Sequence, residues 1–494
     1  GLTVTMPQVP VKTGYQSLGW SKSKKASKAD YKAGQNVTIS KTLTLYAVYK
    51  KLPYTVTFNN NNGTSTSKIY TSLTMYASKN QKVTLPDVPK VKGYTNLGWT
   101  TEKGETEPEY SAGDTVKITK ATQFYAVRRK SNYYTVSYYL GNGSTNAAYQ
   151  KLTQTVEEGT VVTFAKVPAR TGYVNQGWSS KKNSEKATAK AKCTVNKNIT
   201  LYAVQKKAVQ LTFHRCDGST WQKTTLAKGS SYSLPGVRDA EGYTFMGWST
   251  KPMQSVSPQY EAEEKITVNG NVDLYAVVFN RTTETDLTED QLPQVDIYKY
   301  KQVIFVGDSR TEFMENVLTG MGESATKNVK FVCSAGKGLD WFTTTGWAQL
   351  YSIVQHDSNS ILSKKTAVIF NFGVNDLSKS ADYAEYYNWI APQLKSKGCE
   401  LYFMSVNPVN RLMLPNAGRA DRSEAAVRSF NQYMKANLSS AYTYIDMYSY
   451  LKSTGYSFAS DHYGTGTVDD GLHYTTRTYK RIFAKCMDSL RVPA

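Results

Sequence analysis

A motif of seven residues, Gly-Tyr-x-x-x-Gly-Trp, occurs four times in the first half of this 494-residue chain. The copies are GYQSLGW at 14–20, GYTNLGW at 93–99, GYVNQGW at 172–178 and GYTFMGW at 242–248. Successive tryptophans lie 79, 79 and 70 residues apart, and such a period predicts one small domain per copy. The chain is therefore expected to fold as an array of modules, since it is too long for a single hydrophobic core.

Each copy also carries strand signals. Segments such as YTVTF (54–58) and YTVSYY (134–139) alternate aromatic or β-branched residues with polar ones, and NNG or GNG turns follow them. This pattern is typical of β-hairpins. We expect the tryptophan of each copy to be buried against a hairpin, with the preceding glycine leaving room for the indole, and not to stack on a ligand.

The four copies resemble the internalin B-repeat family, also called the Listeria-Bacteroides repeat, over residues 1–281. The resemblance implies tandem small β-rich modules with a β-grasp-like fold, serving as an extracellular stalk of a bacterial surface protein. The segment VTMPQVPVKTGY (4–15) aligns with VTLPDVPKVKGY (83–94), so the first copy lacks its first hairpin. We expect the chain to begin inside a repeat and to be a fragment of a longer protein.

Basic residues dominate the repeats. The net charge is +21, and residues 1–281 hold 38 basic and 17 acidic side chains. The lysines are scattered among Ser, Thr and Asn, which favours a solvated surface over a nucleic-acid site, while binding of a cell-wall polymer through the basic repeats stays open. Five cysteines without zinc-ligand spacing predict neither a metal site nor a cofactor. No apolar run approaches 18 residues, so no membrane span is expected in this fragment.

The composition changes after the last repeat. Residues 281–296, RTTETDLTEDQLPQVD, are acidic and Thr-rich, and we interpret them as a linker. Beyond them, near-continuous apolar runs alternate with amphipathic segments, a pattern that predicts a three-layer α/β domain with a parallel sheet. The predicted domains are a partial repeat 1 (1–50), repeat 2 (51–130), repeat 3 (131–207), repeat 4 (208–281), a linker (282–296) and the α/β domain (297–494).

Three segments of this α/β domain carry candidate catalytic residues. In VIFVGDSR, Ser309 follows a strand and opens a helix, where it is either a nucleophile or, like Asp308, a helix cap. In FNFGVND, Asn375 can donate its amide to an oxyanion. In VDDGLHYT, Asp470 and His473 have the spacing that lets a carboxylate orient an imidazole.

These segments, with the glycines of CSAGKG (333–338), resemble the SGNH hydrolases, also called the GDSL esterase superfamily, over residues 300–494. The resemblance implies a flavodoxin-like fold in which Ser309 is the nucleophile, His473 the general base and Asp470 its orienter. No GxSxG nucleophile elbow occurs in the chain, which argues against an α/β-hydrolase. His356 and His462 lack an acidic residue three positions upstream and are not expected to be catalytic.

The same resemblance implies an oxyanion hole built from the N–H of Ser309, the N–H of Gly336 and the side chain of Asn375, with Gly338 as the rival for the second position. Two residues depart from the family pattern. Arg310 replaces a leucine and Tyr474 replaces a proline. Because Arg310 stands beside the nucleophile and can bind an anionic or hydroxylated group, it is predicted, with Asp308, to contact the substrate.

Taken together, the sequence predicts a secreted or cell-surface bacterial serine esterase that removes O-acetyl or other small acyl groups from a glycan. An acylated glycan or another ester would be its substrate. One alternative is an adhesin or cell-wall-binding protein whose hydrolase domain is degenerate, although the complete set of catalytic residues speaks against it. Another is a lipase or lysophospholipase.

Overall fold

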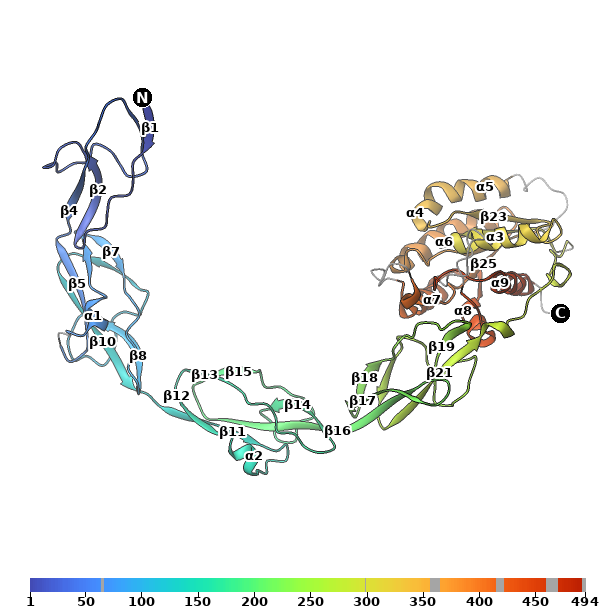
Figure 1. Cartoon of the computed structure of the whole chain (residues 1–494), viewed down its shortest axis with the longest axis horizontal. Coiled ribbons are helices and arrows are strands. Elements are labelled where there is room, and N and C mark those ends of the chain that lie inside the picture. The colour runs from blue at the N-terminus through green and yellow to red at the C-terminus, as the bar shows by residue number, and fades with distance from the viewer. Residues whose placement is uncertain (64–65, 298, 356–364, 415–421, 459–469, 491–494) are drawn as a thin grey trace. The chain divides into compact units, whose positions relative to one another are not determined.

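The computed structural model of the chain describes residues 1–63, 66–297, 299–355, 365–414, 422–458 and 470–490. They form two compact units. The first comprises residues 1–169 and 175–205 and holds repeats 1 to 3. The second comprises residues 170–174 and 206–494, so the fourth repeat clusters with the C-terminal α/β domain (Figure 1).

Repeats 2, 3 and 4 are built on the same mixed arrangement of strands. In repeat 2 the sheet order is β6-β5-β10-β8, where β5 and β10 pair in parallel and β8 is antiparallel to β10. The parallel pair recurs as β11 with β16 in repeat 3 and as β16 with β21 in repeat 4. In repeats 2 and 3 a short helix precedes the strand that pairs antiparallel with the first strand (β6 and β12), whereas in repeat 4 this partner is the longer strand β17, which follows β16 after five residues. The prediction of small β-rich modules is confirmed.

The bounds of the repeat elements are β1 (Leu2–Thr5), β2 (Tyr15–Ser21), β3 (Asn36–Ile39), β4 (Tyr46–Lys51), β5 (Tyr54–Asn59), α1 (Lys68–Thr71), β6 (Met75–Ala77), β7 (Gln81–Thr84), β8 (Tyr94–Thr100), β9 (Thr115–Ile118), β10 (Thr122–Lys130), β11 (Tyr133–Tyr139), α2 (Ala147–Gln150), β12 (Gln154–Glu157), β13 (Thr160–Thr163), β14 (Tyr173–Ser179), β15 (Lys192–Val195), β16 (Ile199–His214), β17 (Thr220–Ala227), β18 (Ser230–Ser233), β19 (Tyr243–Ser249), β20 (Lys265–Val268) and β21 (Val272–Asn280).

The tryptophan of the motif is the centre of each complete repeat. Trp99 and Trp248 are fully buried, and every motif indole donates its N–H to a carbonyl oxygen 13 residues upstream at 2.6 to 2.8 Å. The glycine has a different purpose from the one expected. A β carbon on Gly98 would lie 2.2 Å from the carbonyl oxygen of Tyr110. The glycine therefore makes room for the adjacent backbone segment of the same repeat and not for the indole.

The α/β domain is built on five parallel strands in the order β23-β22-β24-β25-β26. Their bounds are β22 (Tyr300–Gly307), β23 (Val329–Cys333), β24 (Lys365–Asn371), β25 (Cys399–Met404) and β26 (Tyr442–Ile445). Each coincides with one of the apolar runs in the sequence, because strands covered on both faces are apolar throughout. The order is that of flavodoxin-like sheets, as the resemblance implied.

Helices cover both faces of this sheet (Figure 1). Their bounds are α3 (Ser309–Met321), α4 (Leu339–Trp341), a π-helical turn η3 (Phe342–Gly346), α5 (Trp347–Gln355), α6 (Ser380–Lys395), α7 (Glu424–Asn437), α8 (Met447–Thr454) and α9 (Thr476–Ser489), with 3₁₀ turns η1 (Arg281–Thr283), η2 (Glu289–Gln291), η4 (Leu377–Lys379) and η5 (Arg411–Met413). Helices α5, α6 and α7 share one buried cluster with the sheet, and α3, α8 and α9 share the other. In the described part of the chain, no helix is both long enough and apolar enough to cross a membrane.

The segment interpreted as a linker is packed and not extended in solvent. Glu284 is 5% exposed, Leu292 3% and Val295 6%. Both apolar side chains belong to the cluster under α3 and α9. The acidic composition therefore reflects specific buried contacts as well as solvation.

Candidate active site

Ser309 lies at the carboxyl edge of the sheet. Strand β22 ends at Gly307 and α3 begins at Ser309, between the ends of β23 and β24, the two neighbours of β22. The chain leaves β22 toward β23 on one side and returns to β24 on the other, so this is the switch point where ligands bind in open parallel sheets. The position fits a nucleophile.

Asp308, and not Ser309, caps helix α3. Its carboxylate accepts the N–H of Arg310 at 3.0 Å and is 1% exposed. Burial raises the pKa of Asp308 to about 6, although the N–H and the positive charge of Arg310 oppose the shift. The prediction that Asp308 contacts the substrate is wrong, because its carboxylate is enclosed under the helix. Because Asp308 caps the helix, the Ser309 hydroxyl is not needed as a cap and is available for the candidate active site.

The three predicted triad residues form one hydrogen-bonded relay. Ser309 Oγ lies 3.0 Å from His473 Nε2, and His473 Nδ1 lies 2.6 Å from Asp470 Oδ2. The other oxygen of Asp470 accepts the N–H groups of Leu472 and His473 at 2.9 and 2.8 Å, which fixes the carboxylate. This is the arrangement of nucleophile, base and orienter.

Neighbouring residues hold the His473 ring in place and keep the Asp470 carboxylate ionised. The ring of Phe313 in α3 meets the His473 ring edge to face with centroids 4.3 Å apart. Burial alone would raise the pKa of Asp470, but the hydrogen bond and charge of His473, together with the two backbone N–H groups, bring it below its ordinary value. Asp470 is therefore ionised at neutral pH and can stabilise an imidazolium.

The predicted oxyanion residues come from neighbouring segments. Asn375 Nδ2 donates to the carbonyl oxygen of Lys337 at 2.8 Å, which ties the strand-β24 loop to the loop that carries Gly336. The second hydrogen on that nitrogen can be donated to a substrate oxygen. The same glycine loop is tied to α3, because Glu312 accepts the N–H of Ala335 at 2.6 Å.

The two candidate glycines differ in their surroundings. Nothing lies within 4 Å of a β carbon built on Gly336, whereas one on Gly338 would lie 2.3 Å from Asp376 Oδ2. Asp376 also accepts the N–H of Leu339 at 2.9 Å, and burial raises the pKa of Asp376. The space beside Gly336 is therefore open, while Gly338 is required for close packing. The choice of the Gly336 N–H as the second oxyanion donor stays a prediction.

Arg310 does not face the substrate. Its guanidinium is 2% exposed and donates to the carbonyl oxygens of Asn407 at 2.9 Å and Pro408 at 2.8 Å, and its Nε donates to Leu472 at 3.0 Å. The prediction that Arg310 binds substrate is therefore corrected: it fastens the residue after the nucleophile to the turn that carries His473. We call residues 407–414 the clamp loop and residues 470–474 the triad turn.

One residue that positions the candidate oxyanion hole, Arg422, was not predicted from the sequence. Arg422 Nη2 donates to Asn375 Oδ1 at 2.6 Å and is 8% exposed, so it fixes which way the amide of Asn375 points. Arg422 lies 47 residues downstream and just before α7, and no local motif connects it to the GVND segment. His356 and His462 lie outside the described residues.

The fold and the relay have the geometry that a serine hydrolase with a Ser-His-Asp triad requires. The comparisons with known proteins agree. The family model for the Listeria-Bacteroides repeat domain matches residues 1–48, 54–127, 134–204 and 210–277, and the chain belongs to that repeat family. The model for GDSL-like lipases and acylhydrolases matches residues 303–486, so the C-terminal part of the chain is a GDSL-like lipase/acylhydrolase domain.

Two curated relatives are proteins of Evansella cellulosilytica. One, described as a Gly-rich membrane protein, is 28% identical over 274 residues, which cover 54% of this chain and 30% of the relative. The other, described as a membrane protein, is 28% identical over 252 residues, covering 50% of this chain and 35% of the relative. The chain thus spans about a third of the length of the relatives it matches.

Similar solved structures include an acetyl xylan esterase, AlAXEase, at 12% identity with a TM-score of 0.28, covering 38% of this chain and 100% of that chain. A protein of Slackia heliotrinireducens described as an SGNH hydrolase is also 12% identical, with a TM-score of 0.28, covering 39% of this chain and 100% of that chain.

Proposed function

We propose that the chain is an extracellular serine esterase that removes O-acetyl or other small acyl groups from a glycan and is displayed on a stalk of repeats. The observation that carries the proposal is the relay from Ser309 Oγ through His473 to Asp470, with distances of 3.0 and 2.6 Å. An adhesin with a degenerate hydrolase domain would have no reason to retain it. The repeats support a location outside the cell, where the available esters include acylated polymers.

The reaction follows from the geometry. Ser309 Oγ attacks the ester carbonyl carbon as its proton passes to His473 Nε2, and the carbonyl oxygen becomes an oxyanion facing the N–H groups of Ser309 and Gly336 and the amide of Asn375. Collapse of the intermediate breaks the bond to the sugar oxygen, which takes the proton from His473 and leaves as a hydroxyl group. Water then repeats the sequence on the acyl-serine and releases the carboxylic acid.

The test is the Ser309→Ala variant of the full chain. Because the nucleophile contributes to the transition state and little to packing, turnover of p-nitrophenyl acetate should fall by at least about a thousandfold with an unchanged melting temperature. Labelling by a fluorophosphonate should disappear in the same variant. Ser396→Ala, which loses only a hydrogen bond to Gln393 at the end of α6, is the matched control and should keep both activities.

Substrate class is read from a panel. Acetylated xylan, another acetylated glycan and p-nitrophenyl esters of increasing acyl length should be compared at equal concentration. Acetyl release from a glycan together with a steep loss beyond short acyl chains supports the proposal. A preference for long acyl chains would indicate a lipase instead. Normal turnover by Ser309→Ala would show that Ser309 is not the nucleophile.

A further inference from the structure

The fourth repeat shares a hydrophobic core with the hydrolase domain. Met246, Val277 and Phe279 of the repeat are at most 6% exposed and belong to the buried cluster formed by the sheet with α3, α8 and α9. The contact is close: a β carbon on Gly455, just after α8, would lie 2.3 Å from the Phe279 ring. This repeat therefore does not behave as a separate module on a linker.

Charged groups meet across the same interface. Lys452 Nζ of α8 lies 2.8 Å from Glu261 of the repeat and 2.9 Å from Glu424 of α7, and it donates to the carbonyl oxygen of Met246 at 2.8 Å. Arg411 of the clamp loop pairs with Glu263 at 2.9 Å. Lys452 is 6% exposed and Glu424 4%, so the repeat supplies one of the two carboxylates around a buried cation.

The residues that make these contacts are peculiar to the fourth copy. Asp239 is aligned on the motif tryptophan. Glu261 and Glu263 are aligned on the residue that pairs with that tryptophan (Tyr31, Tyr110, Ala189 and Tyr260), because the fourth copy has one residue more between the two. All three acidic residues then correspond to neutral or basic residues in the other copies. The corresponding residues are Val11, Lys90 and Ala169 for Asp239, Lys32, Ser111 and Lys190 for Glu261, and Gly34, Gly113 and Lys192 for Glu263. The acidic face is thus specific to the copy that touches the hydrolase domain.

One residue of the clamp loop connects the repeat to the triad turn. Asn410 donates its backbone N–H to the carbonyl oxygen of Gly471 at 2.8 Å. Its side-chain Nδ2 donates to the Val237 carbonyl oxygen at 3.0 Å and to Asp239 Oδ1 at 2.9 Å, both in the repeat. Arg238 of the repeat donates to the Leu412 carbonyl oxygen.

The fit at the triad turn is tight. Gly471 lies between Asp470 and His473, has a φ of +64°, and a β carbon there would lie 2.3 Å from the Asn410 carbonyl oxygen. A displaced clamp loop would therefore displace the turn. The clamp loop also accepts hydrogen bonds from Arg310, the residue after Ser309, through its Asn407 and Pro408 carbonyl oxygens. It therefore contacts both the segment that carries the serine and the turn that carries the histidine.

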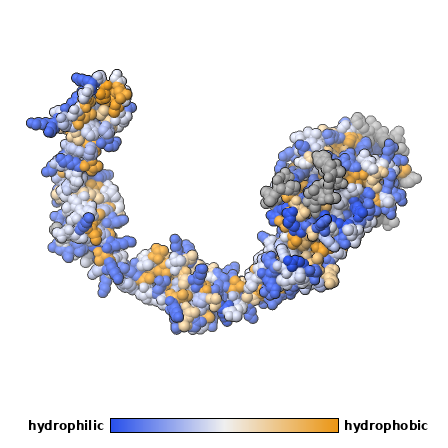
Figure 2. All heavy atoms as spheres, in the orientation of Figure 1, coloured by the Kyte–Doolittle hydropathy of each residue, from blue (hydrophilic) through white to orange (hydrophobic). Residues whose placement is uncertain are grey.

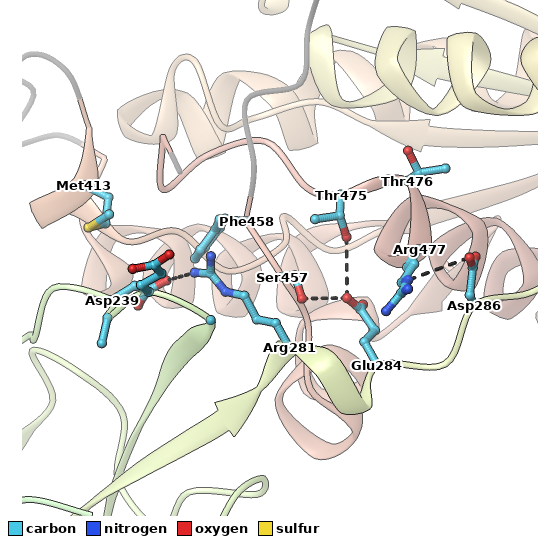
Figure 3. A pocket seen from close by; sticks show the side chains of 13 residues that line it. Asp239, Arg281, Glu284, Asp286, Met413, Ser457, Phe458, Thr475, Thr476 and Arg477 are labelled. Carbon is cyan, nitrogen blue, oxygen red and sulfur yellow. Dashed lines mark hydrogen bonds and ion pairs between the residues drawn. The ribbon is translucent and has the colours of Figure 1, made fainter. Parts of the chain in front are cut away.

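A second connection lies at a cavity of about 790 Å³ between the repeat and the hydrolase domain (Figure 3). On the repeat side, Arg281 pairs with Asp239 at 2.7 Å. On the other side, Glu284 accepts hydrogen bonds from Ser457 at 2.6 Å and from Thr475 at 3.4 Å. Thr475 caps α9 directly after the triad turn, so the chain leaving the repeat also holds the far end of that turn.

We propose that the fourth repeat is a working part of the catalytic unit: it keeps His473 aligned with Ser309, and Asn410 is the positioning residue through which it acts. The inference rests on the proposed ester hydrolysis for one of its readouts. It predicts that a change in the repeat, distant from any substrate, alters the chemical step.

The test uses Asn410→Asp in the full chain. Aspartate keeps the oxygen that accepts the Leu412 N–H but cannot donate to Val237, and it places a second carboxylate against Asp239. We expect kcat for p-nitrophenyl acetate to fall about tenfold or more with KM within about twofold, because misorientation of the base affects the transition state and not binding. The rate of fluorophosphonate labelling should fall in parallel.

A second substitution, in the fourth repeat, should restore the activity that Asn410→Asp loses. Adding Asp239→Asn to Asn410→Asp removes the repulsion and restores a donor and acceptor pair, so kcat and the labelling rate should recover most of the loss. Arg428→Met is the matched interface control. It removes a 2.9 Å hydrogen bond to Ala262 of the repeat without touching the clamp loop, so it should lower the melting temperature and leave kcat within about twofold.

Several outcomes would overturn the inference. They are parental kcat and labelling in Asn410→Asp, a loss that Asp239→Asn does not relieve, or an equal loss in Arg428→Met. Labelling of Ser309 does not depend on the acyl substrate, so a parent chain that labels but cleaves no tested ester would refute only the proposed function. A parent that neither labels nor hydrolyses refutes both.

Discussion

The two residues that depart from the family pattern contact each other. The Arg310 guanidinium carbon lies 5.1 Å from the centroid of the Tyr474 ring, and both side chains donate to the carbonyl oxygen of Pro408, Tyr474 at 2.5 Å. The tyrosine ring also stacks on Phe458 with centroids 5.3 Å apart. A buried arginine needs acceptors and an electron-rich face, so each departure provides a physical reason for the other.

At Asn375 the catalytic and structural roles can be separated. If the amide donates to the oxyanion, Asn375→Ala should lower kcat by roughly a hundredfold to a thousandfold with little change in KM. Asn375→Asp keeps the size and the bond from Arg422 but turns an acceptor toward the oxyanion, so it should be at least as impaired. Ester kinetics and thermal melting of the same preparations provide the measurement. A fully active aspartate variant, or a loss of stability without a loss of kcat, would remove Asn375 from the oxyanion hole.

At the scale of elements, helix α3 has a cap that titrates. Burial raises the pKa of Asp308 to about 6, against about 3.9 in an unfolded chain. The folded state therefore binds the proton more tightly, and its advantage is present below about pH 4 and lost as the pH rises through about 6. Relative to Asp308→Asn, which also caps well, the free energy of unfolding of the parent should decline by about 3 kcal/mol between these limits.

Thermal unfolding of both proteins at pH 4.5 and pH 7.5 measures this difference, because the other carboxylates contribute equally and cancel. The parent should melt nearer to Asp308→Asn at the lower pH and fall behind it at the higher pH. Parallel melting temperatures at the two pH values would show that Asp308 has an ordinary pKa.

Elements were predictable from the sequence where the signal is local. The segment VIFVGD became β22, and 381–398, read as a helix, contains most of α6, because period and apolar runs depend on neighbouring residues alone. The relay was predictable because Asp470 and His473 lie in one turn. Arg422 on Asn375 and Asn410 on Asp239 were not, since side chains 47 and 171 residues apart leave no pattern in either segment. Arg310 was misread for the same reason.

At the scale of the whole molecule, charge and chemistry occupy different parts of the chain. The space-filling view shows hydrophilic side chains scattered over the repeats on the face in view, without a single tract (Figure 2). The whole net charge of +21 belongs to residues 1–281, since basic and acidic residues balance in the rest of the chain. A diffuse positive surface attracts anionic polymer through long-range forces that salt screens.

A chain that begins at residue 206 should therefore keep kcat for p-nitrophenyl acetate within about twofold, because it retains all of the second unit except residues 170–174 and so includes the triad and the fourth repeat. It should lose most of its adsorption to an anionic cell-wall polymer. Co-sedimentation of both proteins with the polymer at 50 and 500 mM salt, roughly 14 and 4 Å of screening length, measures the effect. Adsorption that persists at high salt, or equal adsorption of both chains, would refute an electrostatic role for the first three repeats.

The acidic face of the fourth copy has a consequence for how such genes can change. Tandem repeats invite unequal recombination, which adds or deletes copies whose sequences align. Copies one to three carry no acidic residue at the positions of Asp239, Glu261 and Glu263, so duplication or loss among them changes the number and the total charge of the repeats and leaves the interface with the hydrolase domain as it is. A crossover that placed one of them next to the hydrolase domain would leave Lys452 and Asn410 without their acidic partners. Lineages should therefore vary in the number of upstream copies while the last copy is inherited together with the enzyme.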